Sequence, residues 1–357
     1  MRHAMIMAGG SGTRLWPMSC TGTPKQLINL FGGQSLLELA FKRLDGVVDD
    51  SRRWICAGKQ HASAICDALE NFPASQLLSE PEGRDTLAAV GFTATILQKL
   101  DPDAVFAVLT ADHIIRPEDT FARCLQLGFD LVEAEPSRII TFGITPSEPS
   151  TAYGYVELGD QIEEGAFACK QFVEKPNRET AEQYLASKQF AWNSGMFVFN
   201  AKTFLDALQR MHPEFAKKLA EIGDAWGTNR QQEVLECVYP TLTKTSVDYG
   251  VMEPATTDEE LSICTVPMEV TWLDVGSWPS YGDTLEGDAE GNKSNVTHVH
   301  IDSTETLCVS DDPTHTIATI GCNDLIIVHT KNATLVCPRS ESQRIKELHS
   351  QIEPSLQ

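Results

Sequence analysis

The sequence has few positive charges. It holds 28 Lys and Arg against 50 Asp and Glu, which gives a formal net charge of −22 over 357 residues. Nucleic acids and anionic membranes both bind basic surfaces, so this balance argues against either as a partner. A site that holds phosphate must therefore gather its scarce cations locally or recruit a metal ion.

Long apolar runs and metal-binding cysteine patterns are lacking as well. No stretch approaches 18 apolar residues, so no membrane span is predicted, and the N-terminus has no features of a secretory signal. The ten cysteines form no C-x-x-C pair and no Cys/His cluster with zinc spacing. We therefore expect buried free thiols in a cytoplasmic protein.

The first half of the chain alternates apolar segments with amphipathic ones. Strands are predicted at 3–8, 53–58, 76–81, 104–113 and 138–144, and helices after Ser35 and over 60–69, 86–100 and 118–134. Apolar strands separated by helices indicate a parallel sheet covered on both faces. The predicted class is therefore α/β, with a doubly wound, Rossmann-like domain.

The pattern changes after "GDAEGNKSN" (287–295). Residues 151–286 mix strands, helices and loops, whereas short alternating segments without helices follow 295. We place a domain boundary there, with one domain over 1–287 and a small β unit over 288–357. The chain is expected to finish in a helix with Ile345, Leu348 and Ile352 on one face.

Ligands of doubly wound sheets bind at the carboxyl ends of the strands, which places 9–14, 80–85 and 112–113 on one rim. The turn "GGSG" after the first strand leaves backbone N–H groups free to approach phosphates, and Arg14 and Lys25 follow it. It is not a Walker A motif. A tight strand-to-helix turn is the alternative.

Two aspartates are candidate metal ligands. Asp112 ends the most apolar strand, and Asp274 lies in "WLDVGSW", where Trp272 and Trp278 would wall a pocket. Mg²⁺ usually takes one or two protein carboxylates and completes its shell with water and phosphate oxygens. The alternatives are a helix cap or turn role for Asp112 and a turn role for Asp274. For His113 a structural hydrogen bond is favoured over metal ligation.

Three further segments carry polar residues between apolar ones. In "VEKP", Glu174 and Lys175 would point to opposite faces of a strand, suiting a sugar hydroxyl and a phosphate, unless this is a solvated strand end. "FAWNSGMFVF" predicts a site loop around Asn193. In "TAYGYVEL", Gly154 between two tyrosines predicts a close approach, with a β-bulge as the alternative.

Taken together, these segments resemble the sugar-phosphate nucleotidyltransferases. The matching stretches are "AGGSGTRLWPMS", "PKQL", "LTADH", "YGYVE", "VEKP", "WNSGMFVF", "VDYGVME" and "WLDVGSW", in the family's order from residue 5 to about 280. The narrower ones point to the guanylyl- and mannose-using branch. The resemblance implies a Rossmann-like domain followed by a short left-handed β-helix, and Mg²⁺-dependent transfer of GMP from GTP to α-D-mannose 1-phosphate.

The resemblance also implies roles for individual residues, carried over position by position. The implied nucleotide-phosphate loop is Gly9, Gly10, Gly12, Thr13 and Arg14, with Lys25 on a phosphate and Glu80 and Asp85 near the base or ribose. Asp112 and Asp274 match the Mg²⁺ carboxylates, and Gly154, Glu174, Lys175 and Asn193 match the sugar-phosphate side. Arg14, Lys25 and the two metal carboxylates are the expected catalytic set.

Three positions depart from the family pattern. Cys20 stands where Arg is usual, Asp85 where Asn is usual and Ala152 where Gly is usual. Three other interpretations stay open: another sugar-1-phosphate nucleotidyltransferase, a non-catalytic regulator that senses GDP-mannose, and a structural or assembly module that uses the β unit alone. GTP and mannose 1-phosphate are the expected partners, with no nucleic acid and no membrane, and a homodimer is left open.

Overall fold

The computed structural model describes residues 1–10, 12–20 and 22–353. Its centre is a nine-stranded sheet of order β3-β2-β1-β4-β9-β6-β10-β8-β7. The strands are β1 (Arg2–Met7), β2 (Arg53–Gly58), β3 (Leu77–Glu80), β4 (Val105–Thr110), β6 (Arg138–Ile144), β7 (Tyr155–Glu163), β8 (Ala166–Val173), β9 (Phe190–Asn200) and β10 (Ser262–Met268). The predicted α/β class is confirmed, and so are the predicted strands of the first half except the one over 104–113.

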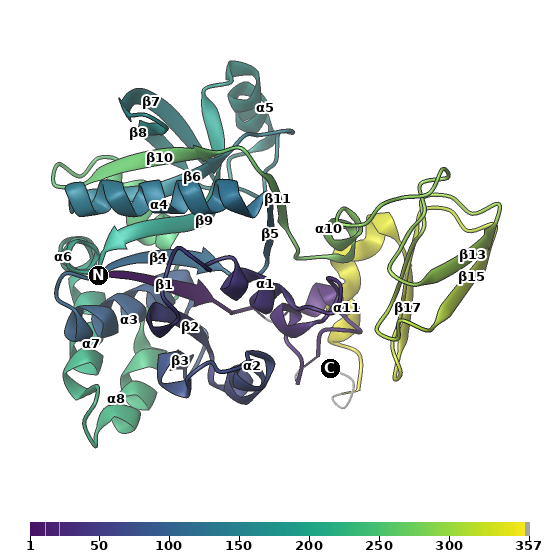
Figure 1. The fold of residues 1–357 in the computed structure, drawn as a ribbon, viewed down its shortest axis with the longest axis horizontal. Helices are drawn as coiled ribbons and strands as arrows, with labels where there is room; N and C mark the ends of the chain where they lie inside the picture. The colour runs from purple at the N-terminus through teal and green to yellow at the C-terminus, as the bar shows by residue number, and fades with distance from the viewer. Residues whose placement is uncertain (11, 21, 354–357) are drawn as a thin grey trace.

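Helices cover both faces of this sheet (Figure 1). One core lies under α1 (Leu36–Lys42), α2 (Ala62–Ala68) and α4 (Glu118–Ala134). The opposite core lies under α3 (Asp85–Leu100), α6 (Ala201–Met211), α7 (Pro213–Ala225) and α8 (Gln231–Val238). The short helices α5 (Arg178–Ser187), α9 (Glu253–Ala255) and α10 (Trp278–Gly282) follow later strands.

Local signals fixed several of these boundaries. Ser35 caps α1, its side chain accepting from the N–H of Glu38 while Glu38 accepts from the N–H of Ser35. The predicted helix over 118–134 is α4, and the one over 86–100 is α3 with one residue added. The segment predicted as one helix over 60–69 is instead a 3-10 turn at Lys59–His61 followed by α2.

The sheet is mixed, not wholly parallel as predicted. β9 lies between β4 and β6 and is antiparallel to both. The site loop predicted at 190–199 is wrong, because this segment is that continuous central strand. A long apolar run suits a position buried on both faces, but periodicity does not reveal which neighbours a strand takes.

The strand predicted over 104–113 is interrupted. β4 ends at Thr110, and a separate strand, β5 (His113–Arg116), pairs antiparallel with β11 (Thr271–Asp274). This two-stranded ladder carries the chain away from the main sheet and brings residues far apart in the sequence side by side.

The C-terminal region is a small parallel coil, seen at the right of Figure 1. β12 (Lys293–Ser294), β14 (Leu307–Ser310) and β16 (Leu325–His329) pair in parallel, as do β13 (Thr297–Ile301) and β15 (Thr316–Ile320). β17 (Thr334–Pro338) returns antiparallel to β16. The β-helix-like unit is confirmed, while its left-handedness and the boundary at 287/288 stay predictions.

The chain's last helix is short. α11 (Ile345–His349) buries Ile345, and Ile352 beyond it packs against the same core, but Leu348 is 42% exposed. The predicted helix is therefore present, but it ends at His349, so Ile352 is not on a helix face shared with Ile345 and Leu348.

A third core joins the small unit to the first turn of the large domain. Leu15, Trp16 and Met18 from the segment after the glycine turn pack with Leu307 and Ile326 of the coil. The side chains that anchor this turn are therefore buried partly by the C-terminal unit.

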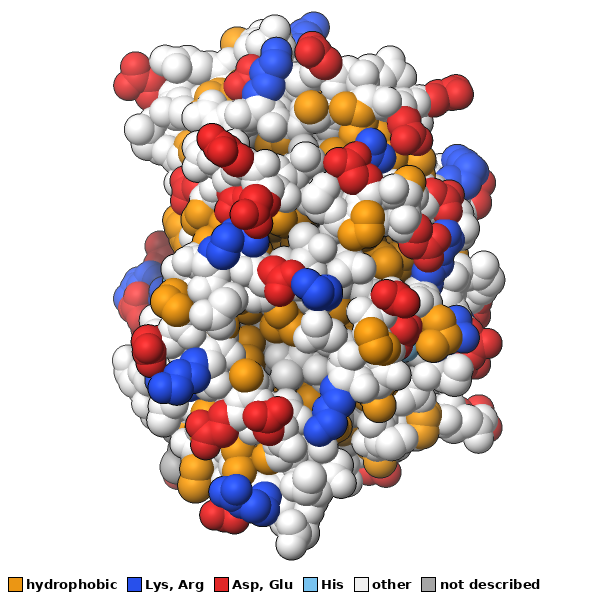
Figure 2. All heavy atoms as spheres, turned by 90° about the vertical axis from the view of Figure 1, so that its left-hand side faces the viewer, with side chains coloured by type: hydrophobic (Ala, Val, Ile, Leu, Met, Phe, Trp, Pro, Cys, Tyr) orange, Lys and Arg blue, Asp and Glu red, His pale blue; other side chains and the backbone are white. Residues whose placement is uncertain are grey.

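The surface carries charges of both signs. On the face drawn in Figure 2, the Lys and Arg side chains are scattered among acidic ones. None of the helices in the described part of the chain is long and apolar enough to cross a membrane.

All ten cysteines are free, as predicted. Cys56, Cys264 and Cys308 are buried, but Cys237 is exposed and the other six are half-buried. The prediction that the thiols are buried therefore holds only for those three.

Candidate active site

The turn after β1 is built from glycines for steric reasons. Gly10 has φ +105° and Gly12 has φ +60°, conformations that L side chains rarely adopt. A Cβ at Gly12 would lie 2.8 Å from the Cβ of Lys25 and 2.6 Å from Oγ of Ser19. Thr13 then opens a 3-10 turn, η1 (Thr13–Leu15), not the α-helix of the alternative prediction.

Lys25 packs against Gly12 of this turn and lies at the start of η2 (Lys25–Leu27). It is only 9% exposed, and its Nζ lies 2.6 Å from Oδ2 of Asp112. The neighbouring Gln26 donates its Nε2–H to the carbonyl of Gly9. The buried cation is therefore held at the junction of the glycine turn and the end of β4.

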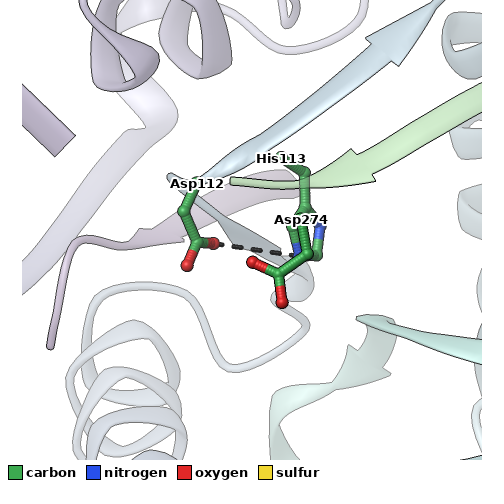
Figure 3. Close-up of side chains that lie close together, drawn as sticks. All are labelled: Asp112, His113 and Asp274. Atoms are coloured by element: carbon green, nitrogen blue, oxygen red, sulfur yellow. Dashed lines mark ion pairs between the residues drawn. The ribbon is translucent and has the colours of Figure 1, made fainter. Parts of the chain in front are cut away.

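The two candidate metal carboxylates are brought together by the β5–β11 ladder. Its register places Asp274 opposite His113, and the N–H of Val275 donates to the carbonyl of Asp112 over 3.0 Å. Ligand atoms of Asp112, His113 and Asp274 all lie within 4.8 Å of one another. Figure 3 shows both carboxylates pointing into the same space beside the His113 ring.

The hydrogen bonds of His113 settle which of its nitrogens carries the proton. The indole N–H of Trp272 donates to Nδ1 over 3.2 Å, and Thr110 Oγ1 lies 2.6 Å from the same atom. Because an indole only donates, Nδ1 accepts, so the proton sits on Nε2, 3.8 Å from Oδ1 of Asp112. Burial also lowers the pKa of His113. The ring is thus neutral and is held by structural hydrogen bonds, as predicted.

The donor set fits a small hard cation. Lys25 occupies Oδ2 of Asp112, which leaves Oδ1 and the carboxylate of Asp274 facing the shared space. Burial would raise the pKa of Asp112, but the charge of Lys25 and the hydrogen bond that Lys25 donates hold it below its usual range. Asp112 is therefore a carboxylate at neutral pH, and two carboxylates are the number that Mg²⁺ usually takes from a protein.

A cavity of about 400 Å³ opens beside these residues. It is lined by backbone or side chains of Met7, Gly9, Gly10, Cys56, Glu80, Gly83, Asp85, Thr86, Ala89, Thr110, Asp112 and Lys244. The three loops predicted to share one rim therefore do meet around one cavity, although Arg14, Lys25 and Asp274 lie outside its lining.

Glu80 and Asp85 lie at the far end of this cavity, and each already has a partner. Glu80 is buried and accepts a 2.6 Å hydrogen bond from the hydroxyl of Tyr239, and burial raises the pKa of its carboxyl. Asp85 has φ +68°, and its Oδ1 accepts from the N–H of Thr86 at the start of α3. Asp85 therefore stabilises the backbone of its own loop, while Glu80 lines the cavity as a hydrogen-bond acceptor.

The four residues predicted for the sugar side lie together at the edge of β7, β8 and β9. A Cβ at Gly154 would lie 2.5 Å from Oε2 of Glu174 and 3.4 Å from Cβ of Asn193, so the predicted close approach is present. Glu174 and Lys175 are not strand neighbours on opposite faces, because β8 ends at Val173 and Lys175 has φ +46°. In this bend Lys175 Nζ pairs with Glu174 Oε1 at 3.0 Å.

Arg14 is exposed and reaches toward the C-terminal unit. Its Nη1 donates to Oε1 of Gln343 over 3.3 Å, and a Cβ at Gly276 would lie 3.4 Å from its Nη2. Neither Trp272 nor Trp278, predicted to wall a pocket, lines the cavity described above. Trp278 is fully buried in the third core and donates to the carbonyl of Trp16, and Trp272 packs on His113.

Sequence reasoning missed four residues near the site. Lys244 lines the cavity, Tyr239 holds Glu80, Gln343 holds Arg14, and Asp248 contacts Asn193. Only Asp248 had a signal, because it stands in "VDYGVME". The other three lie in segments without a motif, and only tertiary folding places them.

Comparison with known proteins agrees with this architecture. The "Nucleotidyl transferase" family profile matches residues 3–291, and the "MannoseP isomerase/GMP-like beta-helix domain" profile matches residues 296–352. The fold and the site thus define a nucleotidyl transferase.

Individual relatives narrow the assignment. The mannose-1-phosphate guanylyltransferase of Escherichia coli K12 is 35% identical over 362 residues, covering 98% of this chain and 73% of that protein. The xanthan biosynthesis protein XanB of Xanthomonas campestris pv. campestris is 35% identical over 354 residues, covering 98% and 72%. A crystal structure from Thermus thermophilus, described as a "mannose-1-phosphate geranyltransferase", has a TM-score of 0.85 at 30% identity and covers 98% of both chains. The chain belongs to the nucleotidyl transferase family, among the mannose-1-phosphate guanylyltransferases.

Proposed function

We propose that this chain transfers GMP from GTP to α-D-mannose 1-phosphate, giving GDP-mannose and pyrophosphate. The observation that carries the proposal is the position of Asp112, which lines one cavity with the glycine turn and has both Lys25 and Asp274 close to its carboxylate. Nucleotidyl transferases generally use a divalent metal. We propose that Mg²⁺ is that metal here, held by Asp112 and Asp274, where it would neutralise phosphate charge.

The reaction needs little from the protein beyond position and charge. A phosphate oxygen of the sugar phosphate attacks the α-phosphorus of GTP, and the bond from that phosphorus to the bridging oxygen of the β-phosphate breaks. The attacking phosphate monoester is largely dianionic at neutral pH, so no general base is required. Positioning and electrostatic stabilisation then supply most of the catalysis.

The chain's own residues divide this work. Gly9 and Gly10 line the cavity with Asp112, where their backbone N–H groups would suit the leaving phosphates. Lys25 and Arg14 supply positive charge to a protein with net charge −22. Gly154, Glu174, Lys175 and Asn193 form the sugar-phosphate end, where carboxylate and amide suit hydroxyls and the ammonium suits a phosphate.

The test is pyrophosphate release from GTP and mannose 1-phosphate in Mg²⁺, with the sugar nucleotide identified by mass spectrometry. We expect GDP-mannose, no product in excess EDTA, and slower turnover with ATP or with glucose 1-phosphate. A preference for another nucleotide or sugar would leave a nucleotidyltransferase but overturn the guanylyl or mannosyl assignment. Binding of GDP-mannose without any turnover would identify the regulatory alternative.

A further inference from the structure

Asp248 is a carboxylate at the sugar end that has no role in the reaction proposed above. It opens η7 (Asp248–Met252), a single π-helical turn, and such turns recur at functional sites. Its Oδ1 accepts a 2.8 Å hydrogen bond from Nδ2 of Asn193. The contact joins the turn at 248–252 to the central strand β9.

The side-chain amide of Asn193 is held in one orientation. Its Oδ1 accepts from the hydroxyl of Thr141 over 3.0 Å and from the N–H of Gly195 over 3.1 Å. With its oxygen fixed by two donors, the amide must turn its NH₂ group to Asp248. Asn193 therefore fixes one oxygen of Asp248, while the described residues offer no side-chain donor within hydrogen-bonding distance of its Oδ2.

Asp248 lies near a second carboxylate and forms no ion pair within the described part of the chain. The side chain of Glu174 is 6% exposed, and the nearby cation, Lys175, is paired with Glu174. Burial and then the charge of Glu174 raise the pKa of Asp248 to about 6. Two neighbouring carboxylates with one nearby cation repel each other in the folded protein, and groups perturbed in this way cluster at functional sites.

A sugar is the ligand chemistry that such a pair suits. Carboxylate oxygens only accept hydrogen bonds at neutral pH, and a hexose presents several hydroxyl donors close together. The absence of a side chain at Gly154 lets the backbone approach Glu174 closely, since a Cβ there would lie 2.5 Å from its Oε2. Lys175, which pairs with Glu174, suits the phosphate of a sugar 1-phosphate.

We infer that Asp248 is a sugar-specificity residue, whose Oδ2 accepts a hydrogen bond from one hydroxyl of the hexose 1-phosphate while Asn193 fixes its Oδ1. The inference rests on the proposed function, because it names the group that reads the sugar at the proposed sugar-phosphate site. Glu174 and Asp248 then act as two hydrogen-bond acceptors. A hexose binds well only when it places one hydroxyl group within hydrogen-bonding distance of each.

The test is a double-mutant cycle between protein and substrate. Asp248→Asn keeps the shape and an acceptor for Asn193 but offers an NH₂ group where Oδ2 stood. Wild type and variant are compared with mannose 1-phosphate and its 2-, 3-, 4- and 6-deoxy analogues, by kcat/KM for pyrophosphate release and by calorimetric Kd. Asp206→Asn on α6, whose carboxylate pairs with the exposed Lys202, is the matched control.

We expect one deoxy analogue to bind about 10- to 100-fold less tightly than mannose 1-phosphate to the wild type, the range for a hydrogen bond to a charged group. In Asp248→Asn that penalty should fall to less than about threefold while the other penalties stay unchanged. If Asp248 were purely structural, the variant would bind mannose 1-phosphate and its four deoxy analogues more weakly by the same factor. The penalties of the substitution and of each missing hydroxyl would then simply add, and that result would overturn the inference.

Two outcomes separate this inference from the proposed function. If the wild type releases no pyrophosphate, the proposed function fails, but the Kd cycle still decides the role of Asp248. If no deoxy analogue binds the wild type more weakly than its parent, the inference fails whether or not Asp248→Asn folds.

Discussion

The two ends of the candidate site each hold a half-buried carboxylate, but the surroundings shift the pKa of the two groups in opposite directions. At the nucleotide end, Asp112 is paired with the buried Lys25, and its pKa lies below the usual range. At the sugar end, Asp248 lies near Glu174, and its pKa rises to about 6. In the proposed function, the nucleotide end would neutralise phosphate charge, and the sugar end would offer hydrogen-bond acceptors.

The largest effect is expected from substitutions that remove a carboxylate charge at the nucleotide end. Asp274→Asn or Asp112→Asn should lower kcat/KM by at least about 10³-fold, because metal-based charge stabilisation provides several kcal/mol. The measurement is pyrophosphate release in Mg²⁺, with thermal unfolding recorded for each variant. Asp119→Asn, from an exposed ion pair on α4, is the control. Wild-type turnover in either metal variant would reject the metal assignment.

Lys25→Met tests the cation of the same end. The side chain keeps most of its volume but loses the charge beside Asp112, so kcat should fall by on the order of 10²-fold, the scale for one preorganised donor. Steady-state kinetics separate the roles, since a change in KM alone would mean that Lys25 serves binding only. The exposed Lys59, paired with Glu236 outside the site, provides the control Lys59→Met.

The sugar end predicts a pH-dependent stability effect of intermediate size. A carboxyl whose native pKa is raised from 3.8 to about 6 binds more protons when folded, so its contribution to stability falls as pH rises between these values. Asp248→Asn removes this penalty and should raise Tm more at pH 8 than at pH 5. Glu174 and Lys175 face the same group and remain in both proteins. An equal Tm shift at both pH values would contradict the raised pKa.

The smallest effect is expected from removing the hydrogen bond between Arg14 at the nucleotide end and Gln343 of the C-terminal unit. Gln343→Ala removes one exposed 3.3 Å hydrogen bond to Arg14, so KM for GTP should rise by no more than about threefold, with Tm unchanged. Initial rates at varied GTP measure this. A tenfold rise would mean that the β-helix-like unit positions Arg14 directly, not only through the third core.

The sequence predicted the pieces of the nucleotide end better than those of the sugar end. Gly10 and Gly12 have the positive φ values that a glycine turn favours, and Asp112 follows β4 as expected. The segment around Asn193 was predicted as a loop but is the central strand, and Glu174 and Lys175 lie in a bend. Turn chemistry is local, whereas the sugar end is assembled from strands whose order no local pattern specifies.

By itself the sequence determined the α/β class, the capped helix at Ser35, the helix over 118–134 and the identity of the glycine turn, because periodicity, caps and turn residues act over a few positions. Only the tertiary structure decided that β9 enters the sheet antiparallel, that Asp274 lies opposite His113 and that Asn193 meets Asp248. These contacts join residues far apart in the sequence or insert a strand between two others. They follow from which apolar faces pack together, and that choice is made by the whole core at once.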